Sequence, residues 1–356
     1  KHNQGHNWHQ DGQGIVLNLD FDLQKQLMTI LQERMKSMNL RKAAAIAMDP
    51  NTGGILAMVS TPTFDNNVFS GKISATDYQA IQQDSGLPFL NRAIAGQYPP
   101  GSTIKPLIAS GILQEKIISP ETKIIDKGYI EVKNQYDPSI VYRYSGLEAP
   151  GLYDIRTAIS MSSNIYFYVL GGGYRGQEGL GPQRIKTYLD LFGLGSQTNI
   201  DLPGEENGFI PSVEWKKQTY GQGWQDGDTY HLAIGQGGLI VTPLQMAVAY
   251  SAIANGGTLY RPEVVKEIVN TSGGKIKTVK KIEPIIIREN FIDAINLKIV
   301  REGMRQGVLS GTGQVLQSVP VACASKTGTA QTSKGDNVYD IWASVFCPYN
   351  NPQIVI

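Results

Sequence analysis

The sequence predicts an α/β fold of the α+β kind, in which an antiparallel sheet is flanked by helices and an all-helical subdomain is inserted. Three observations predict it. Apolar runs separated by turn residues open the chain, helical periodicity dominates its middle, and apolar runs close it. Of 356 residues, 41% are hydrophobic and 18% charged, which is enough apolar material for a sizeable core. We expect strands from both ends of the chain to share one sheet.

The first sixty residues contain a helix and a hairpin. Residues 1–14 are polar and lack a period, so we interpret them as a loop or a remnant of a preceding region. A helix begins after Asp20, whose carboxylate can cap it, and apolar residues recur at helical spacing as far as Met35. Residues 43–48 and 55–60 are apolar runs joined by Asp-Pro-Asn-Thr-Gly-Gly, which predicts an antiparallel hairpin.

The remaining elements follow from periodicity and from turn residues. Irregular or loop-rich stretches are predicted at 61–100 and 193–235, and short strands with turns at 114–153. Helices are predicted at 103–113, 154–170, 185–192, 243–254 and 291–308. Strands are predicted at 319–330, 340–347 and 353–356.

Charge and hydropathy limit the function classes. The chain has 32 basic and 31 acidic residues, a net charge of +1, which argues against a nucleic-acid partner. It has no apolar run of the roughly 18–20 residues that span a membrane, and no signal-peptide pattern. Cys323 and Cys347 fall on neighbouring predicted strands. A disulfide between them is possible, but we expect two buried free thiols.

The first candidate for chemistry is Ser102 with Lys105. The serine stands at a predicted helix start after Pro-Pro-Gly, and the lysine follows three residues later on the same helix face. A serine hydroxyl is a poor nucleophile until a base takes its proton, and a desolvated lysine can be that base. The same Ser-x-x-Lys pattern at 272–275 lies in a glycine turn, which we assign to a solvated loop.

Two further motifs carry suitable side chains. Ser162 and Asn164, within the predicted helical region, offer a hydroxyl for proton relay and an amide for a substrate. Lys326 and Thr327, on a predicted edge strand, can hold a carboxylate, and Gly328 leaves room for a ligand along the backbone. A surface polar cluster on the helix and edge protection on the strand are the alternative interpretations.

The order and context of the three motifs point to one family. Ser-x-x-Lys, a serine/asparagine triplet and Lys-Thr-Gly are the motif set of penicillin-binding proteins and class A β-lactamases. The chain resembles the transpeptidase domain of class B penicillin-binding proteins, in particular the elongation-specific group. Further stretches that are similar lie at 90–102, 163–168, 200–205, 234–237, 241–247 and 326–331.

The resemblance implies a serine D,D-transpeptidase without a cofactor. Ser102 would be acylated, Lys105 would act as general base, and Ser162 and Asn164 would relay protons and bind the peptide. Lys326 and Thr327 would hold the terminal carboxylate of a D-alanyl-D-alanine stem peptide, and Gly328 would lie beside that peptide. The N–H groups of Ser102 and Thr329 would form the oxyanion hole. β-Lactams would acylate the same serine.

The resemblance also implies a setting. It implies one transpeptidase domain over residues 15–356, on the extracytoplasmic face of the bacterial membrane (the periplasm), with an anchor outside this chain. The family's usual C-terminal helix would be missing after Ile356. A RodA-type glycan polymerase and MreC are the partners it implies. Some relatives bind zinc between the first two motifs. Here that stretch holds Asp126, Asp137 and Asp154 but neither histidine nor cysteine, so we predict no metal.

Two other functions remain open. A β-lactamase or β-lactam sensor of the same fold would use the same motifs, but rapid deacylation requires a carboxylate placed for a water, and no persuasive one stands out in the sequence. A non-catalytic scaffold of the wall-synthesis complex would keep the fold without the activity. The intact motifs argue against a scaffold.

Overall fold

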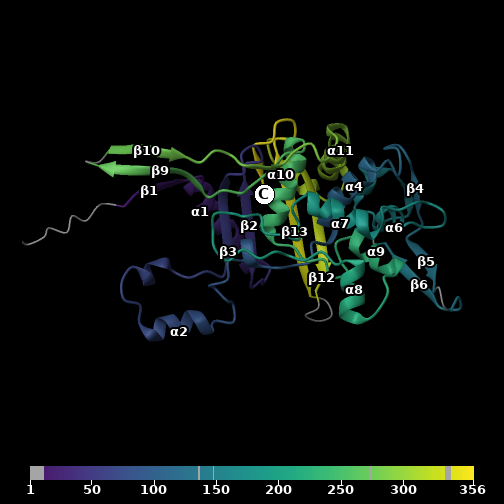
Figure 1. Ribbon diagram of the computed structural model, residues 1–356, viewed down its shortest axis with the longest axis horizontal. Helices are drawn as coiled ribbons and strands as arrows, with labels where there is room; N and C mark the ends of the chain where they lie inside the picture. The colour runs from purple at the N-terminus through teal and green to yellow at the C-terminus, as the bar shows by residue number, and fades with distance from the viewer. Residues whose placement is uncertain (1–11, 135–136, 147, 273–274, 333–337) are drawn as a thin grey trace, which may run out of the picture.

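A five-stranded antiparallel sheet unites the two ends of the chain. The computed structural model describes residues 12–134, 137–146, 148–272, 275–332 and 338–356. The strand order is β12-β13-β14-β2-β3, so strands from both ends form one sheet, as predicted (Figure 1). The strands are β2 (Ala43–Met48), β3 (Ile55–Thr61), β12 (Ala324–Gln331), β13 (Tyr339–Cys347) and β14 (Ile354–Val355).

Local chemistry explains the predicted hairpin between β2 and β3. In the turn, the Asp49 carboxylate accepts hydrogen bonds from the Asn51 N–H at 2.8 Å and the Thr52 hydroxyl at 2.9 Å. Aspartate at the start of a turn satisfies backbone and side-chain donors in this way. At the other edge, β12 pairs with β13 from Ala324↔Phe346 to Gln331↔Tyr339. This pairing leaves β12 as an edge strand.

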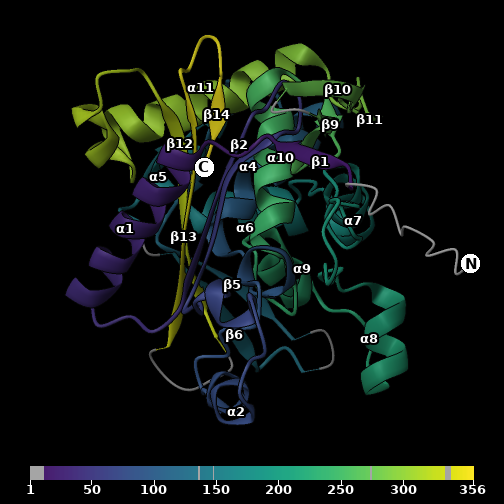
Figure 2. The same cartoon turned by 90° about the vertical axis from the view of Figure 1, so that its left-hand side faces the viewer.

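Helices cover both faces of the sheet. Helix α1 (Phe21–Ser37) lies on one side of the strands and α10 (Pro243–Asn255) on the other (Figure 2). Asp20 caps α1 as predicted, accepting from the Leu23 N–H at 3.0 Å. Helix α10 is buried along almost its whole length, as its continuous apolar sequence requires. No helix in the described ranges is long and apolar enough to cross a membrane.

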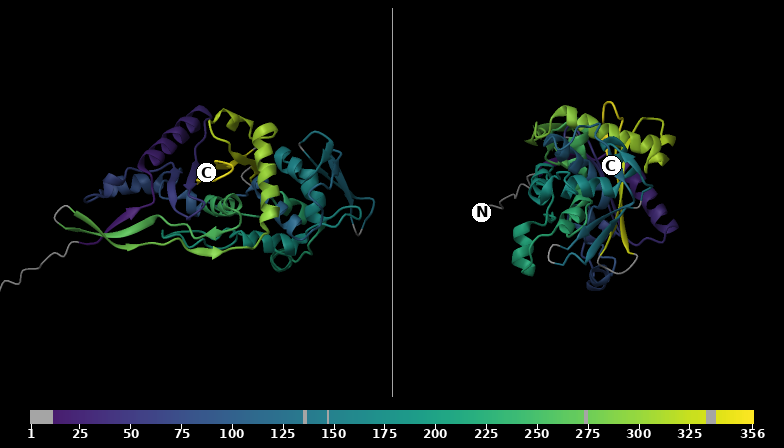
Figure 3. Two further views of the ribbon diagram at one scale, coloured as in Figure 1. Left: turned by 90° about the horizontal axis from the view of Figure 1, so that it is seen from above. Right: turned by 90° about the vertical axis from the view of Figure 1, so that its right-hand side faces the viewer.

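A helical region adjoins the β12 edge of the sheet. Helix α11 (Ala294–Ser310) packs on both β12 and α5 and so connects the two parts (Figures 1 and 3). Two small strand pairs, β4-β7 and β5-β6, complete this end. The other helices here are α4 (Lys105–Gln114), α5 (Ile155–Met161), α6 (Asn164–Gly172), α7 (Gly181–Leu191) and α9 (Asp226–Ala233), and the strands are β4 (Ile124–Asp126), β5 (Tyr129–Lys133), β6 (Val141–Ser145) and β7 (Gly151–Tyr153).

An arm of three strands extends from the opposite end (Figures 1 and 3). It consists of β1 (Gly14–Leu17), β9 (Val265–Ser272) and β10 (Lys275–Lys281), paired antiparallel in the order β1-β9-β10. The expected loop at 272–275 is wrong for Ser272, which ends β9, and for Lys275, which begins β10. Residues 273–274 lie outside the described residues. At the base of the arm, β8 (Leu259–Tyr260) pairs with β11 (Ile286–Arg288).

Several expected loops and one expected helix differ in the structure. The stretch 61–100 contains α2 (Ala75–Gln83) and α3 (Arg92–Ala95). The stretch 193–235 contains α8 (Val213–Tyr220) and α9. The single helix expected at 154–170 is two helices, α5 and α6, separated at Ser162. Helices α2, α3, α8 and α9, which lie in the expected loops, are short and carry little apolar periodicity, so the pattern of the sequence did not reveal them. Short 3-10 turns lie at η1 (Asn66–Phe69), η2 (Gly101–Ile104) and η3 (Gln314–Ser318).

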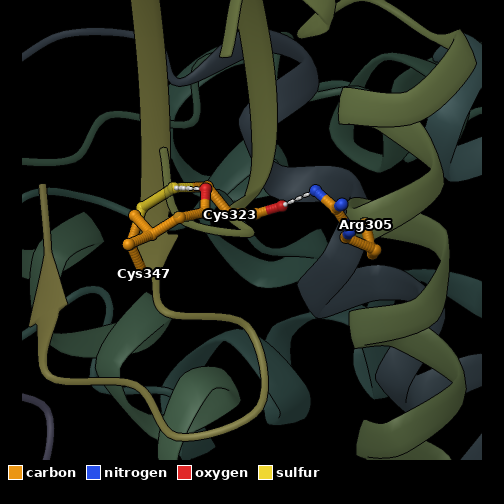
Figure 4. Close-up of a disulfide and its surroundings, with 4 residues drawn as sticks. Arg305, Cys323 and Cys347 are labelled. Atoms are coloured by element: carbon orange, nitrogen blue, oxygen red, sulfur yellow. Dashed lines mark hydrogen bonds between the residues drawn. A yellow bond between two sulfur atoms is a disulfide. The ribbon is translucent and has the colours of Figure 1, made fainter. Parts of the chain in front are cut away.

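The two cysteines form a disulfide, so the expectation of free thiols was wrong (Figure 4). The antiparallel register explains the pairing. Because Ala324 lies opposite Phe346, Cys323 and Cys347 face each other across the two strands, with 4.6 Å between their Cα atoms. That separation lies within the range that a disulfide requires. Arg305 of α11 donates to the Cys323 carbonyl oxygen at 2.8 Å and so connects the disulfide to this helix.

Candidate active site

Ser102 lies in the tight turn η2, which leads directly into α4. The serine is half-buried while its neighbours are buried. Gly101 has a φ of +54°, and a Cβ there would lie 2.8 Å from the Thr329 carbonyl oxygen. Its N–H donates to the Gly235 carbonyl oxygen at 3.0 Å. Only glycine fits this position, so the turn that presents Ser102 is fixed between β12 and the Gly235 loop.

Lys105 is the first residue of α4 and is fully buried, with 0% of its surface exposed. Its backbone N–H donates to the Ser102 carbonyl oxygen, which joins the two residues in one turn. Its Nζ donates to the Ser162 carbonyl oxygen and to Asn164 Oδ1 at 2.7 Å, and lies 3.3 Å from Ser162 Oγ. Burial lowers the pKa of Lys105 to about 7, against the opposing effect of the Glu148 and Asp126 carboxylates.

The junction between α5 and α6 supplies the acceptors for that lysine. Ser162 ends α5 in the left-handed conformation, with a φ of +66°. Ser163 then begins α6: its Oγ accepts from the Tyr166 N–H at 3.1 Å and donates to Asp126 Oδ2 at 2.8 Å. A sharp turn held at both sides places the carbonyl and hydroxyl of Ser162 and the amide of Asn164 around one ammonium group. The triplet lies at a helix junction instead of within a helix.

Lys326 approaches the same hydroxyl from the strand β12. Only 1% of its surface is exposed, and its Nζ donates to Ser162 Oγ and to the Thr327 carbonyl oxygen, both at 2.8 Å. Burial lowers the pKa of Lys326 well below its usual value, and the neighbouring Lys105 charge lowers it further. Three motifs separated by more than two hundred positions therefore meet at one oxygen atom, Ser162 Oγ.

The other three predicted residues follow Lys326 along β12. Thr327 donates from its hydroxyl to Thr312 Oγ1 at 2.8 Å. A Cβ at Gly328 would lie 2.9 Å from the Pro100 carbonyl oxygen and 3.0 Å from the Thr103 backbone nitrogen. The strand therefore runs against η2, and Thr329 lies beside the turn that carries Ser102. All eight predicted site residues are thus gathered where η2, the α5–α6 junction and β12 meet.

Other residues that shape this region had not been assigned a role from the sequence. Gly235, whose Cβ would lie 2.1 Å from the Gly101 carbonyl oxygen, belongs to the stretch 234–237 that is similar to the family. Tyr250 of α10 donates to the Thr103 carbonyl oxygen at 2.7 Å. Glu148 accepts from the Asn164 N–H at 3.2 Å. Nothing in the local sequence marks Glu148, because only the tertiary fold brings it to α6.

The three aspartates between the first two motifs each accept hydrogen bonds in a different part of the fold. Asp126 accepts from Ser163, Asp154 caps α5 by accepting from the Thr157 N–H at 2.9 Å, and Asp137 accepts from Ser139 in an exposed turn. Within the described ranges there is no group of three or more histidine, cysteine, aspartate or glutamate residues that could hold a metal ion.

The sheet, the helical region and the serine–lysine cluster define a domain of the penicillin-binding type. Comparison with protein families supports this class: the model of the penicillin binding protein transpeptidase domain matches residues 43–356. The chain belongs to this family.

Individual relatives agree. The chain is 36% identical over 320 residues to the peptidoglycan D,D-transpeptidase MrdA of Acinetobacter baumannii, covering 90% of this chain and 45% of that protein. It is 32% identical over 366 residues to MrdA of Escherichia coli, covering 98% and 54%. The chain therefore spans about half the length of these curated relatives.

Solved structures give the same result. PBP2 of Pseudomonas aeruginosa, in complex with WCK 5153, has a TM-score of 0.79 at 32% identity, covering 97% of this chain and 73% of that one. The complex between PBP2 and MreC from Helicobacter pylori gives a TM-score of 0.79 at 28% identity, covering 96% and 59%. The expected fold, an antiparallel sheet flanked by helices with a helical subdomain, is confirmed.

Proposed function

We propose that this chain is the catalytic domain of a peptidoglycan D,D-transpeptidase that cross-links stem peptides during cell elongation through an acyl-enzyme on Ser102. The observation that carries the proposal is the convergence at Ser162 Oγ. Two buried lysines donate to that oxygen, and one of them, Lys105, lies in the same turn as Ser102. A lysine whose pKa is lowered to about 7 is a suitable base at neutral pH.

Acylation then follows from the positions of these groups. Ser102 Oγ attacks the carbonyl carbon between the two terminal D-alanines while Lys105 takes its proton. The N–H groups of Ser102 and Thr329 stabilise the oxyanion. A proton passes through Ser162 to the departing amine, and D-alanine leaves. Lys326 and Thr327 hold the terminal carboxylate, and the Asn164 amide binds the peptide backbone. The space beside Gly328, expected to admit the donor peptide, is instead occupied by Pro100 and Thr103, so Gly328 allows β12 to lie against η2.

Deacylation completes the cross-link. The amine of a neighbouring stem peptide attacks the Ser102 ester, and the serine regains its proton as the amide forms. A β-lactam resembles the donor and acylates Ser102 through its ring carbonyl. Because the amine released by ring opening stays attached to the acyl group, it does not leave the site, and the acceptor amine cannot enter. The steps use side chains and backbone N–H groups of this chain together with groups of the two stem peptides, and we propose that neither a metal nor a cofactor takes part.

The relatives suggest a setting for this activity. We propose that the domain works outside the cytoplasmic membrane (in the periplasm), with its anchor outside residues 15–356, beside a RodA-type glycan polymerase and MreC. The H. pylori complex supports the MreC partner, and a structure of a peptidoglycan synthase complex, 30% identical to this chain, supports a polymerase. The disulfide fits an oxidising compartment.

Mass spectrometry after incubation with a labelled penicillin tests the proposal. We expect a single adduct, mapped to the peptide that contains Ser102 and absent in Ser102→Ala. The matched control is Ser272→Ala, which removes the serine of the second Ser-x-x-Lys pattern and should leave the adduct unchanged. Folded protein without an adduct would contradict the proposal and favour the scaffold.

Turnover of a chromogenic β-lactam separates the transpeptidase from a β-lactamase. We expect one rapid equivalent of ring opening per enzyme followed by slow hydrolysis. Sustained fast hydrolysis would favour the β-lactamase, and acylation without transfer to any acceptor amine would favour a β-lactam sensor.

A further inference from the structure

A carboxylate outside the three motifs lies against the serine–lysine cluster. Glu148 belongs to the connection between β6 and β7, and its Oε2 accepts from the Asn164 N–H at 3.2 Å. Asn164 is the first residue of α6 and the residue whose side-chain oxygen receives Lys105 Nζ. Glu148 therefore binds the backbone of Asn164, whose side chain in turn binds Lys105, the proposed base.

The chain approaches α6 closely at this point. A Cβ at Gly146 would lie 3.2 Å from Glu148 Oε2 and 3.1 Å from Ile165 Cγ1. The absence of a side chain at residue 146 lets the connection fold over the first turn of α6 and bring the carboxylate to it. Glu148 itself is half-buried, so its charge is screened less than that of a surface carboxylate.

Two carboxylates oppose the burial of the two lysines. Glu148 and, to a smaller extent, Asp126 raise the pKa of Lys105. Glu148 also raises the pKa of Lys326, while Lys105 lowers it. Glu148 also raises the pKa values of Tyr153 and Tyr168, although burial is the larger cause for both. Both tyrosines therefore stay neutral at physiological pH.

Asp126 and Glu148 differ in how they are engaged. The Asp126 carboxylate is buried and accepts from the Ser163 hydroxyl and from the Gly128 N–H at 2.7 Å, which commits it to the turn before α6. Glu148 contacts the backbone of Asn164 directly and influences both lysines. Of the two, Glu148 is the residue that links the geometry of the site to its charge.

We infer that Glu148 is a positioning residue of the proposed acyl-transfer site: it fixes Asn164 through the backbone and supplies the negative charge that balances Lys105 and Lys326. This inference rests on the proposed function. It assigns a role to a residue outside the three motifs, and it gives the connection between β6 and β7 a direct part in setting the protonation of the site.

The pH dependence of acylation by a fluorescent penicillin tests this role. Glu148→Gln keeps an oxygen that can accept from Asn164 but removes the charge. Without that charge the pKa of Lys105 falls further, so the neutral base is present at lower pH. We expect the rising limb of the acylation rate to move down by about one pH unit, with a plateau close to that of the unmodified protein.

Two further variants separate charge from geometry. Glu148→Asp keeps the charge and should keep the limb in place, whereas Glu148→Ala loses both contributions and should also lower the plateau, on the order of tenfold. The matched control is Glu302→Gln, because the Glu302 carboxylate accepts from Arg156 Nε at 2.7 Å and is not among the groups that shift the pKa of Lys105 or Lys326. Its limb should not move.

The outcomes are distinguishable. If the acylation rate of Glu148→Gln rises over the same pH range as that of the unmodified protein, the inference is overturned while the proposed function stays intact. Equal shifts in Glu148→Gln and Glu148→Asp would also overturn it, because charge would then not be the cause. Failure of the unmodified protein to react at all would instead overturn the proposed function.

Discussion

The active-site junction, where η2, β12 and the turn between α5 and α6 meet, and the β1–β9–β10 arm differ in how far their side chains are buried. At the junction, Lys105 and Lys326 are 0% and 1% exposed, and backbones from η2 and β12 are in contact. In the arm, large apolar side chains face outward: Ile15 is 59% and Ile276 70% exposed. The comparison teaches that the positions least able to change in this molecule are those where buried polar groups must be hydrogen-bonded. Substitutions should therefore have large effects at the junction and small effects in the arm.

The largest effect is expected from Lys105→Met, which keeps the length and burial of the side chain but removes the base. Acylation by penicillin, followed in a stopped-flow instrument, should slow by about 10²–10⁴-fold. The helical content should be retained, but the free energy of unfolding should fall by about 1–3 kcal/mol, because the Ser162 carbonyl oxygen and Asn164 Oδ1 lose their buried donor. A variant that reacts at the unmodified rate would remove Lys105 from the mechanism and break the comparison.

Backbone contact at the junction gives the next effect. Gly235 has a φ of +78°, and a Cβ there would lie 2.1 Å from the Gly101 carbonyl oxygen. Gly235→Ala should lower the free energy of unfolding by about 4 kcal/mol and slow acylation, because the turn carrying Ser102 must move.

Gly176→Ala is the matched control for that variant. Gly176 has a similar φ of +86°, but a Cβ there would meet no atom within 4 Å. It should lose only about 1 kcal/mol, from backbone strain alone. Urea denaturation measures both variants, and equal losses would show that close contact at Gly235 adds nothing.

The disulfide that joins the ends of β12 and β13 should have an intermediate effect on stability. It closes a loop with a sequence separation of 24 between Cys323 and Cys347. Replacing both cysteines with alanine should lower the free energy of unfolding by about 3 kcal/mol. A thiol count under denaturing, non-reducing conditions should find no free thiol, and two free thiols would contradict the pairing.

The smallest effect is expected in the arm. Ile276→Thr replaces an exposed β-branched residue of β10 with another that favours strands. The free energy of unfolding should change by no more than about 0.5 kcal/mol, and the acylation rate should be unchanged. A loss comparable to that of Gly235→Ala would show that the arm is as constrained as the junction.

The sequence predicted the elements that carry strong local signals. Asp20 and the apolar spacing after it placed α1, and the apolar runs around Asp49 placed the hairpin. The three motifs were recognised because their residue types and order are specific, and the structure brings them together.

The remaining features depend on tertiary contacts. Ser162 breaks the helix between α5 and α6 without a glycine or proline to mark it, because Asp126 and Lys105 hold the turn from other elements. The disulfide depends on strand register, which the spacing of the cysteines does not fix. Glu148 reaches α6 only through the fold of the β6–β7 connection.

The central claim is that burial turns Lys105 into the base that activates Ser102, and the pH profile of acylation in the unmodified protein tests it most directly. Because the base must be neutral and the pKa of Lys105 is lowered to about 7, the acylation rate should rise with pH through a midpoint near that value. A midpoint near the ordinary lysine pKa of about 10.4, or a rate independent of pH, would contradict the account.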